Sequence, residues 1–237
     1  MKESRPSTFR FKRFEISDSV SAMKIGTDGV ILGAWAFESY SPKHILDVGA
    51  GTGLISLMMA QRFSSATIDG IEIDERAASE ARQNVAASPW YDRVGIVAAD
   101  FTECKSLKAD AIVSNPPFFT SGILASDPHR ADARHEGSLS VDSLLDGAAE
   151  IMDQRGRLAV IIPFERLDKT VYSAAIRRLD ACRIAELASN PASQPIRVMI
   201  EFTKGLADTF SRERIDIRSE AGSFSSRYAE LTSEFYL

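Results

Sequence analysis

Short apolar runs rich in β-branched residues alternate with segments of helical periodicity from about residue 44 onward. This alternation is typical of a parallel sheet whose strands are joined by crossover helices. The pattern predicts strands at 44–48, 67–73, 94–98, 109–114, 157–163, 183–189 and 198–204, and helices at 54–62, 76–87, 139–152 and 167–179.

The predicted helix at 76–87 is amphipathic. Its alanines and Val85 recur at helical spacing and should face the sheet, whereas the polar residues between them should face water. These polar residues are Arg76, Glu80, Arg82 and Asn84.

The segment that joins the last two predicted strands, 190–195, is too short for a crossover helix. These strands should therefore form an antiparallel hairpin at one edge of the sheet. Together the elements predict a doubly wound, Rossmann-like α/β fold: a seven-stranded, mostly parallel sheet with an antiparallel C-terminal hairpin.

Two segments flank the predicted core at 44–205. In residues 1–43, the stretch 9–16 alternates like one strand, and the apolar run 30–37 reads as a helix with Thr27 or Asp28 as its cap. In residues 206–237, the stretch 214–218 alternates like an edge strand and 228–236 resembles a short helix. Since no low-complexity linker separates these parts, we expect residues 1–237 to form a single domain.

Composition narrows the class of protein. A chain of 237 residues, 44% apolar and 26% charged, is ordinary for a soluble globular domain. The charged N-terminus and the short apolar stretches predict a cytoplasmic protein without a membrane anchor. Cys104 and Cys182 lie far apart, so we expect neither a disulfide framework nor a metal site. With a net charge of −5, a nucleic-acid partner would require a local basic surface.

A glycine-rich segment follows the first predicted core strand, with Gly49, Gly51 and Gly53 spaced as G-x-G-x-G. Such a turn lets the backbone approach a ligand and directs helix N-terminal amides toward it, although a glycine cluster alone also fits an ordinary tight turn. Leu54 occupies the position of the third glycine in a dinucleotide fingerprint, so the spacing disfavours NAD.

Acidic residues end three successive predicted strands, at the edge where open α/β sheets bind ligands. Asp47 could meet a ligand ammonium, and Glu72 could accept both hydroxyls of a ribose, with Asp74 as an alternative. Asp100, with Phe101 beside it, could accept an adenine amino group. This set suits S-adenosylmethionine, which carries an ammonium and a sulfonium.

The tetrapeptide Asn115-Pro116-Pro117-Phe118 ends the fourth predicted strand. An exocyclic amine on a heteroaromatic ring is a poor nucleophile because its lone pair is delocalised into the ring. The Asn115 side-chain oxygen and the Pro116 carbonyl could accept both N–H bonds and hold the nitrogen toward sp3 geometry. The prolines stiffen this loop, and Phe118 and Phe119 could stack on the planar group. Alone, the motif also fits a proline turn.

These motifs resemble those of the bacterial tRNA(Val) (adenine-37-N6)-methyltransferase family, a group of class I methyltransferases. The similarity covers nearly the whole chain, and the segment 24–35 is the most diagnostic because other enzymes with NPPY or NPPF lack it. The family often has tyrosine where this chain has Phe118. The matching segments are 22–35, 46–54, 88–90, 114–119 and 234–237.

The resemblance implies methyl transfer from S-adenosylmethionine to N6 of an adenine in a tRNA anticodon loop. It also implies that Lys24, Gly26, Thr27 and Asp28 lie over the amino-acid end of the cofactor, although Thr27 and Asp28 could instead serve only as helix caps. We expect a monomer.

RNA binding requires basic and aromatic groups around the pocket. Arg10, Lys12 and Arg13 interleave with phenylalanines at 9, 11 and 14, and a polar segment at 126–137 contains Arg130 and Arg134. Both regions could contact RNA, or could be a solvated hairpin and a solvated loop.

Other functions use the same tetrapeptide. N2-guanine methyltransferases of ribosomal RNA and glutamine-N5 protein methyltransferases usually carry an additional recognition domain, for which residues 1–43 are too few. DNA adenine enzymes normally have a target-recognition domain as well. A non-enzymatic alternative is a cofactor-binding module that contacts RNA.

Overall fold

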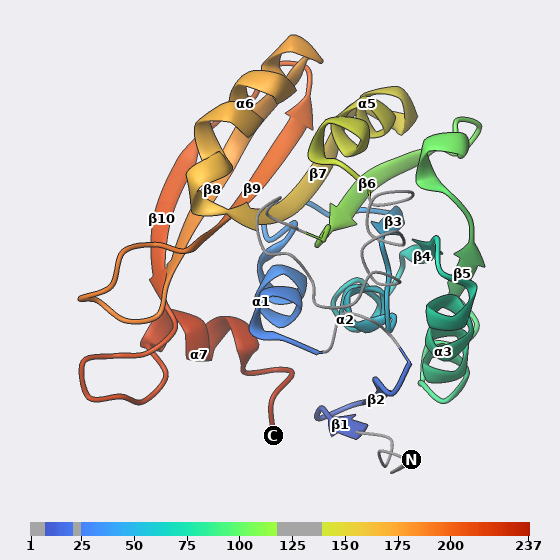
Figure 1. The fold of residues 1–237 in the computed structure, drawn as a ribbon, viewed down its shortest axis with the longest axis horizontal. Helices are drawn as coiled ribbons and strands as arrows, with labels where there is room; N and C mark the ends of the chain where they lie inside the picture. Colours follow the sequence, from blue (N-terminus) through green and yellow to red (C-terminus); the bar gives the residue numbers. More distant parts are fainter. Residues whose placement is uncertain (1–7, 21–24, 118–138) are drawn as a thin grey trace, which may run out of the picture.

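The computed structural model describes residues 8–20, 25–117 and 139–237. The described residues form an eight-stranded sheet in the order β10-β8-β9-β7-β6-β3-β4-β5 (Figure 1). Among the eight strands of this sheet, only β9 runs antiparallel to its neighbours, β7 and β8. The strands are β3 (His44–Val48), β4 (Thr67–Glu72), β5 (Val94–Ala98), β6 (Ala109–Ser114), β7 (Met152–Pro163), β8 (Leu179–Ala188), β9 (Arg197–Lys204) and β10 (Ser211–Asp216).

The Rossmann-like class and the hairpin between β8 and β9 are thus confirmed. The prediction of seven strands is wrong by one, because β10 pairs in parallel with β8 and occupies the edge of the sheet. The alternation at 214–218 indicated a strand, but the partner of that strand depends on a contact with residues far away in the sequence.

Helices cover both faces of the sheet. The core on one face includes residues of α1 (Thr27–Trp35), α2 (Leu54–Arg62) and α3 (Glu75–Ala86). The core on the other face includes residues of α5 (Val141–Ile151) and α6 (Leu167–Ile176). The remaining helices are α7 (Ser226–Thr232), which packs against α1, and the 3-10 turns η1 (Phe101–Glu103) and η2 (Phe164–Arg166). Helix α2 has the predicted bounds.

The N-terminal segment forms two short antiparallel strands, β1 (Thr8–Arg10) and β2 (Glu15–Ser17), so the single strand expected at 9–16 is wrong. A turn closed by the amide of Phe11 and the carbonyl of Phe14 at 2.9 Å separates them. The turn stacks the two rings with centroids 4.6 Å apart and buries both. These two phenylalanines therefore contribute to the core.

Helix α3 buries two of the polar residues that were expected to face water. Asn84 donates to the carbonyls of Ser17 and Thr52 and accepts from the Ser17 amide, each at 2.9 Å. Glu80 accepts from the Ser19 hydroxyl at 2.7 Å. The segment after β2 covers this side of α3, whereas Arg76 and Arg82 are exposed as expected.

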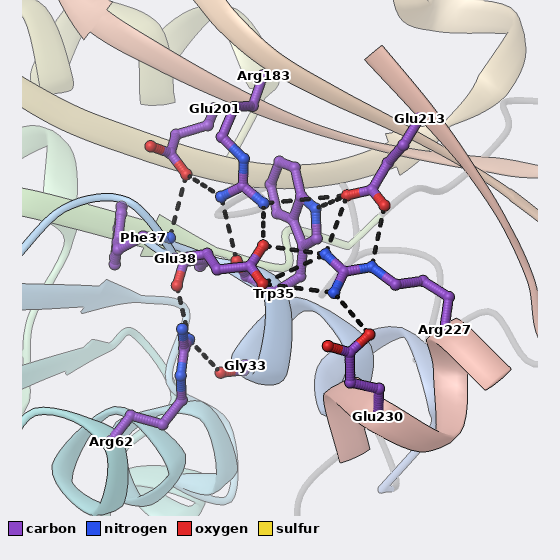
Figure 2. Close-up of polar contacts among 11 residues, drawn as sticks. Gly33, Trp35, Phe37, Glu38, Arg62, Arg183, Glu201, Glu213, Arg227 and Glu230 are labelled. Atoms are coloured by element: carbon purple, nitrogen blue, oxygen red, sulfur yellow. Dashed lines mark hydrogen bonds and ion pairs between the residues drawn. The ribbon is translucent and has the colours of Figure 1, made fainter. Parts of the chain in front are cut away.

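An ion-pair network connects the C-terminal segment to the sheet and to the end of α1 (Figure 2). Glu201 of β9 is buried and accepts from Arg183 of β8 at 3.1 Å. Arg183 also reaches Glu38 at 2.8 Å, and Arg227 of α7 reaches both Glu38 and Glu213 of β10 at 3.0 Å. The end of α1 and the C-terminal segment are therefore tied to the same sheet.

Candidate active site

The glycine-rich turn and the double-proline segment leave neighbouring strands at the same register. Val48 of β3 pairs with Ser114 of β6, and the Ser114 hydroxyl donates to the Val48 carbonyl at 2.7 Å. Gly49 and Asn115 are the next residues on each strand. Because paired strands lie about 4.8 Å apart, the two segments begin side by side at the carboxyl edge of the sheet.

Helix α1 covers Asn115 from one side. A Cβ atom built on Gly29 would lie 3.9 Å from the Asn115 Nδ2 atom. Asn115 and Pro117 are half-buried and Pro116 is buried. Phe118, the last residue of the predicted catalytic tetrapeptide, lies outside the described residues, as does Phe119.

The turn itself requires glycine. Gly49, Gly51 and Gly53 have φ angles of 77°, 56° and 80°, in the left-handed region that other residues enter at a cost. The amide of Gly49 donates to the carbonyl of Ile71 at 2.8 Å, which ties the turn to the end of β4. The backbone thus forms a cradle without side chains immediately before α2.

Glu72 lies at the end of β4 beside this cradle. Its two carboxylate oxygens accept from the amides of Gly51 at 2.8 Å and Asp74 at 3.0 Å. Asp74 caps α3 by accepting from the amides of Arg76 and Ala77. Since a carboxylate offers about four acceptor sites, Glu72 can still accept ribose hydroxyls, and of the two acids it is the better placed.

Asp47 has no exposed surface, which contradicts a direct contact with a ligand ammonium. Its Oδ2 atom accepts from the Ser56 hydroxyl at 2.7 Å, while Oδ1 is buried without a hydrogen-bond partner in the described structure. Burial raises the pKa of Asp47 to about 7; hydrogen bonds from Ser56 oppose this shift and the charge of Glu72 adds to it. The carboxyl group is therefore enclosed by the fold beside Ser56 of α2.

Asp100 lies after β5, directly before η1, and is the N-terminal cap residue of that turn. Its Oδ1 atom accepts both the amide and the hydroxyl of Thr102, at 2.8 and 2.7 Å. The neighbouring Phe101 ring is buried against Gly147 of α5, on the far face of the sheet. The position of Asp100 suits the expected contact with adenine, whereas the Phe101 ring belongs to the core and does not face the site.

The N-terminus of α1 differs from the expected cap. The cap residue is Gly26, and neither Thr27 nor Asp28 caps the helix through its side chain. Asp28 instead accepts from Arg197 at the start of β9 at 2.8 Å. Gly26 and Thr27 are exposed, and Lys24 lies outside the described residues.

The comparisons with known proteins agree on one family. A model of the "Methyltransferase small domain" matches residues 31–179. The chain is 43% identical to a "tRNA1(Val) (adenine(37)-N6)-methyltransferase" of Porphyromonas gingivalis, over 96% of this chain and 94% of that protein. Proteins with the same name from Bacteroides thetaiotaomicron and Escherichia coli O157:H7 are 41% and 38% identical, and the alignments cover 97% and 98% of this chain and 97% and 96% of those proteins. The chain belongs to this methyltransferase family.

Solved structures agree with this methyltransferase assignment at the level of the fold. A predicted O-methyltransferase from Agrobacterium tumefaciens superposes with a TM-score of 0.69 at 18% identity, covering 88% of this chain and 96% of that one. P. horikoshii TYW2 in complex with MeSAdo superposes with a TM-score of 0.58 at 13% identity, covering 84% and 70%.

One residue of this methyltransferase site escaped sequence reasoning. Ile73 directly follows Glu72 at the carboxyl edge, and its apolar side chain is 51% exposed. The sequence contains the signal for it, an isoleucine between Glu72 and Asp74 at a predicted strand end, and the structure shows that this side chain forms an exposed apolar surface beside Glu72.

The predicted RNA-binding residues of the N-terminal hairpin have partners within the protein. Arg10 pairs with Glu15 at 2.9 Å, Lys12 donates to the Ser233 carbonyl at 2.6 Å, and Arg13 lies 5.5 Å from the Trp90 ring centroid. All three remain exposed. Arg130 and Arg134 lie outside the described residues.

Within the described part of the chain, no group of three or more histidine, cysteine or acidic residues could hold a metal ion. No helix in the same ranges has the length and apolar character needed to cross a membrane.

Proposed function

We propose that the protein transfers a methyl group from S-adenosylmethionine to N6 of an adenine in a tRNA anticodon loop, namely adenine 37 of tRNA-Val. The observation that carries the proposal is the pairing of Val48 with Ser114, which places the glycine cradle and Asn115 at one edge of the sheet. The names of the relatives, which state this substrate, support the same conclusion.

The residues present fit the cofactor. S-adenosylmethionine supplies an electrophilic methyl group on a sulfonium. The three glycines with positive φ let the backbone approach it, Glu72 can accept the ribose hydroxyls, and Ile73 can pack against the adenine ring. Asp100 can accept the adenine amino group, and Gly26 to Asp28 border the site from α1.

Asn115 and Pro116 orient the reacting amine. Acceptors on both N–H bonds reduce conjugation of the nitrogen lone pair with the ring and aim that lone pair at the methyl group. Positioning and preorganised polar groups supply most of the acceleration in such a step. The stiff Pro116-Pro117 segment and the hydrogen bond from Ser114 to Val48 hold this geometry. Phe118 and Phe119 are proposed to stack on the adenine ring that carries the amine.

The adenine must leave its stack to reach Asn115. Unstacking costs a few kcal/mol and is cheapest in a loop, which favours an anticodon-loop adenine over one in a duplex. Arg10, Lys12 and Arg13 on the N-terminal hairpin, with Arg130 and Arg134, are proposed to contact the RNA backbone. We propose that the protein acts as a monomer and without a metal ion.

Transfer of label from the cofactor to unmodified tRNA, in the presence of a chelator, tests the function. Nucleoside mass spectrometry should then find N6-methyladenosine. N2-methylguanosine in its place would favour the activity of the ribosomal RNA enzymes, and label on a protein glutamine would favour glutamine-N5 protein methyl transfer. Absence of transfer despite cofactor binding would favour a cofactor-binding RNA module.

A further inference from the structure

A cavity of about 390 Å³ lies between the start of α1, the β8–β9 turn and the C-terminal segment. This volume is within the range of about 300–1,000 Å³ typical of sites for small molecules and flat rings. Of the residues assigned to the proposed methyl-transfer site, the cavity shares Thr27. Its walls include Thr27, Asn190, Arg218, Phe224, Tyr228 and Tyr236.

The aromatic wall is partly open to solvent. Phe224 is 46% exposed, and its ring stacks with Tyr236 at a centroid distance of 6.2 Å and an interplanar angle of 12°. Tyr228 is buried behind both, with its ring centroid 4.9 Å from that of Phe224. Phe224 and Tyr236 thus present a partly exposed aromatic surface on the wall of the cavity.

Arg218 contributes a positive charge. Its guanidinium lies 5.3 Å from the Phe224 ring centroid and donates to the Gly222 carbonyl at 2.7 Å. Within the described residues, no ion pair joins Arg218 to a carboxylate, whereas the nearby Arg214 pairs with Asp216 and Arg227 pairs with Glu213 and Glu38. Its charge is therefore not compensated by a direct ion pair.

The backbone around the cavity is held in place. The amide of Arg218 donates to the Ser189 carbonyl at 3.0 Å, and the Ser225 amide donates to the Ile217 carbonyl at 3.1 Å. Arg214 donates to the carbonyl of Ser193 at 2.8 Å and so fixes the β8–β9 turn. The cavity is part of the fold before any ligand binds.

The cavity opens at the same edge of the sheet as Asn115. Strands β8 and β10 run parallel to β6, so their carboxyl ends lie at the catalytic edge. The order β8-β9-β7-β6 separates β8 from β6 by three strand spacings, or about 14 Å at ~4.8 Å each. Through Val160 and Ile200, Ser114 is level with Ile184, and β8 continues four residues further to Ala188, about 13 Å at ~3.3 Å per residue. The two strand ends are therefore about 19 Å apart, which a rise of about 3.4 Å per stacked nucleotide spans with up to about six nucleotides.

We propose that this cavity binds an unpaired base of the RNA substrate, up to about six nucleotides from the methylated adenine; this inference rests on the RNA substrate of the proposed function. The base stacks on Phe224 and Tyr236, and Arg218 contacts the adjoining phosphate. Aromatic faces beside an unpaired arginine are the combination that single-stranded RNA requires.

A set of abasic RNAs tests this assignment. The unmodified anticodon stem-loop and variants, each lacking one base, are assayed for methyl transfer by the wild-type protein and by Phe224→Ala. Removal of one base at the stated distance should raise the wild-type KM by about 5- to 100-fold, the value of one stacked base. Phe224→Ala should already have this raised KM on the intact RNA, with kcat nearly unchanged. Removal of the same base from the RNA should not raise the KM of this variant further.

Phe210→Ala is the matched control, because Phe210 is 59% exposed and lies outside the cavity. It should behave as the wild type, and Arg218→Gln should raise KM at all positions. Cofactor affinity and thermal unfolding should be the same for Phe224→Ala and Phe210→Ala. Equal KM values for these two variants on every RNA would overturn the assignment.

Direct binding of the stem-loop, followed by fluorescence anisotropy, separates the two proposals. RNA binding that depends on Phe224 without methyl transfer by the wild type would overturn the proposed function alone. Methyl transfer and RNA binding that are both independent of Phe224 would overturn the cavity assignment alone.

Discussion

The polar side chains at the carboxyl edge differ in how many hydrogen-bond acceptor sites remain available to a ligand. Glu72 already accepts two backbone amides and retains further acceptor sites, Asp100 uses one oxygen as a cap, and Asp47 is enclosed below the turn. Asn115 is half-buried beneath α1. At this scale, the division is between groups that touch a ligand and groups that shape its electrostatic surroundings.

Replacing Asn115 by alanine should lower kcat by about 10²–10³-fold, the typical loss of one preorganised hydrogen bond at a developing charge. Cofactor affinity should change little, because the cradle is built from β3 and β4. Asn115→Asp, which retains an oxygen at the same place, should keep more turnover than Asn115→Ala. Quenched single-turnover assays measure the difference; equal losses would contradict the role of the amide oxygen.

Asp47 should make stability depend on pH. Its pKa in the folded protein, about 7, exceeds the ordinary value of 3.8 because of burial. The folded state therefore binds the proton more tightly, and the stabilising effect of that proton is complete below the ordinary pKa and is lost as pH rises through about 7. Urea unfolding should show the stability of the wild type, relative to Asp47→Asn, falling by up to about 1.4 kcal/mol per pH unit in this window.

The same group should couple cofactor binding to proton release. A cation held above the turn favours the ionised carboxylate, so cofactor affinity should increase from pH 6 to pH 8. Calorimetry in two buffers of different ionisation enthalpy measures the released proton. Asp47→Asn should abolish it, and an unchanged proton count in that variant would assign the release to another group.

Secondary-structure elements place these residues through contacts that lie away from the site. Helix α3 holds the end of β2 and the glycine turn with one side chain, since Asn84 forms hydrogen bonds with both Ser17 and Thr52. Helix α1 packs closely on α2, where a Cβ on Gly33 would meet the Met58 sulfur at 2.6 Å. These contacts bring the N-terminal segment to the edge that carries Asn115.

Asn84→Ala should destabilise the protein by about 1–3 kcal/mol, because buried backbone groups lose their partners. Limited proteolysis should also cleave the N-terminal segment faster, since the clamp on Ser17 is lost. Gln83→Ala changes the exposed neighbour on the same helix and should have little effect. Equal unfolding midpoints for the two variants would show that the clamp contributes nothing measurable.

The whole molecule is joined by the ion-pair network of Figure 2. Arg183 and Arg227 link three strands, the end of α1 and α7. Glu201, which pairs with Arg183, is buried, with a relative exposure of 2%. Such a network connects segments from both ends of the chain, so the described parts should unfold together.

Glu201→Gln should cost up to about 3–5 kcal/mol, because Arg183 and the Phe37 amide lose a buried anionic partner. Denaturation followed by fluorescence and by circular dichroism should still give one transition. Glu220→Gln, at an exposed position, is the control and should leave the midpoint unchanged. A separate early transition of the C-terminal segment would contradict the joining role of the network.

Local patterns in the sequence determined much of this protein. Periodicity located most strands and helices, and residue spacing located the glycine turn, Glu72, Asp100 and Asn115 at strand ends. These features depend on neighbours along the chain, because side-chain direction repeats with each turn or each pair of residues. The functional chemistry could be inferred for the same reason, since parallel strands bring their ends to one edge.

Tertiary packing decided the rest. The position of β10 beside β8, the burial of Asp47, Glu80 and Asn84, and the pairing of Asp28 with Arg197 all depend on residues distant in the sequence. The cavity around Phe224 is built from segments around residues 27, 190, 218 and 236. A polar residue has the same local pattern whether water or a distant segment covers it, so only the folded structure distinguishes the two.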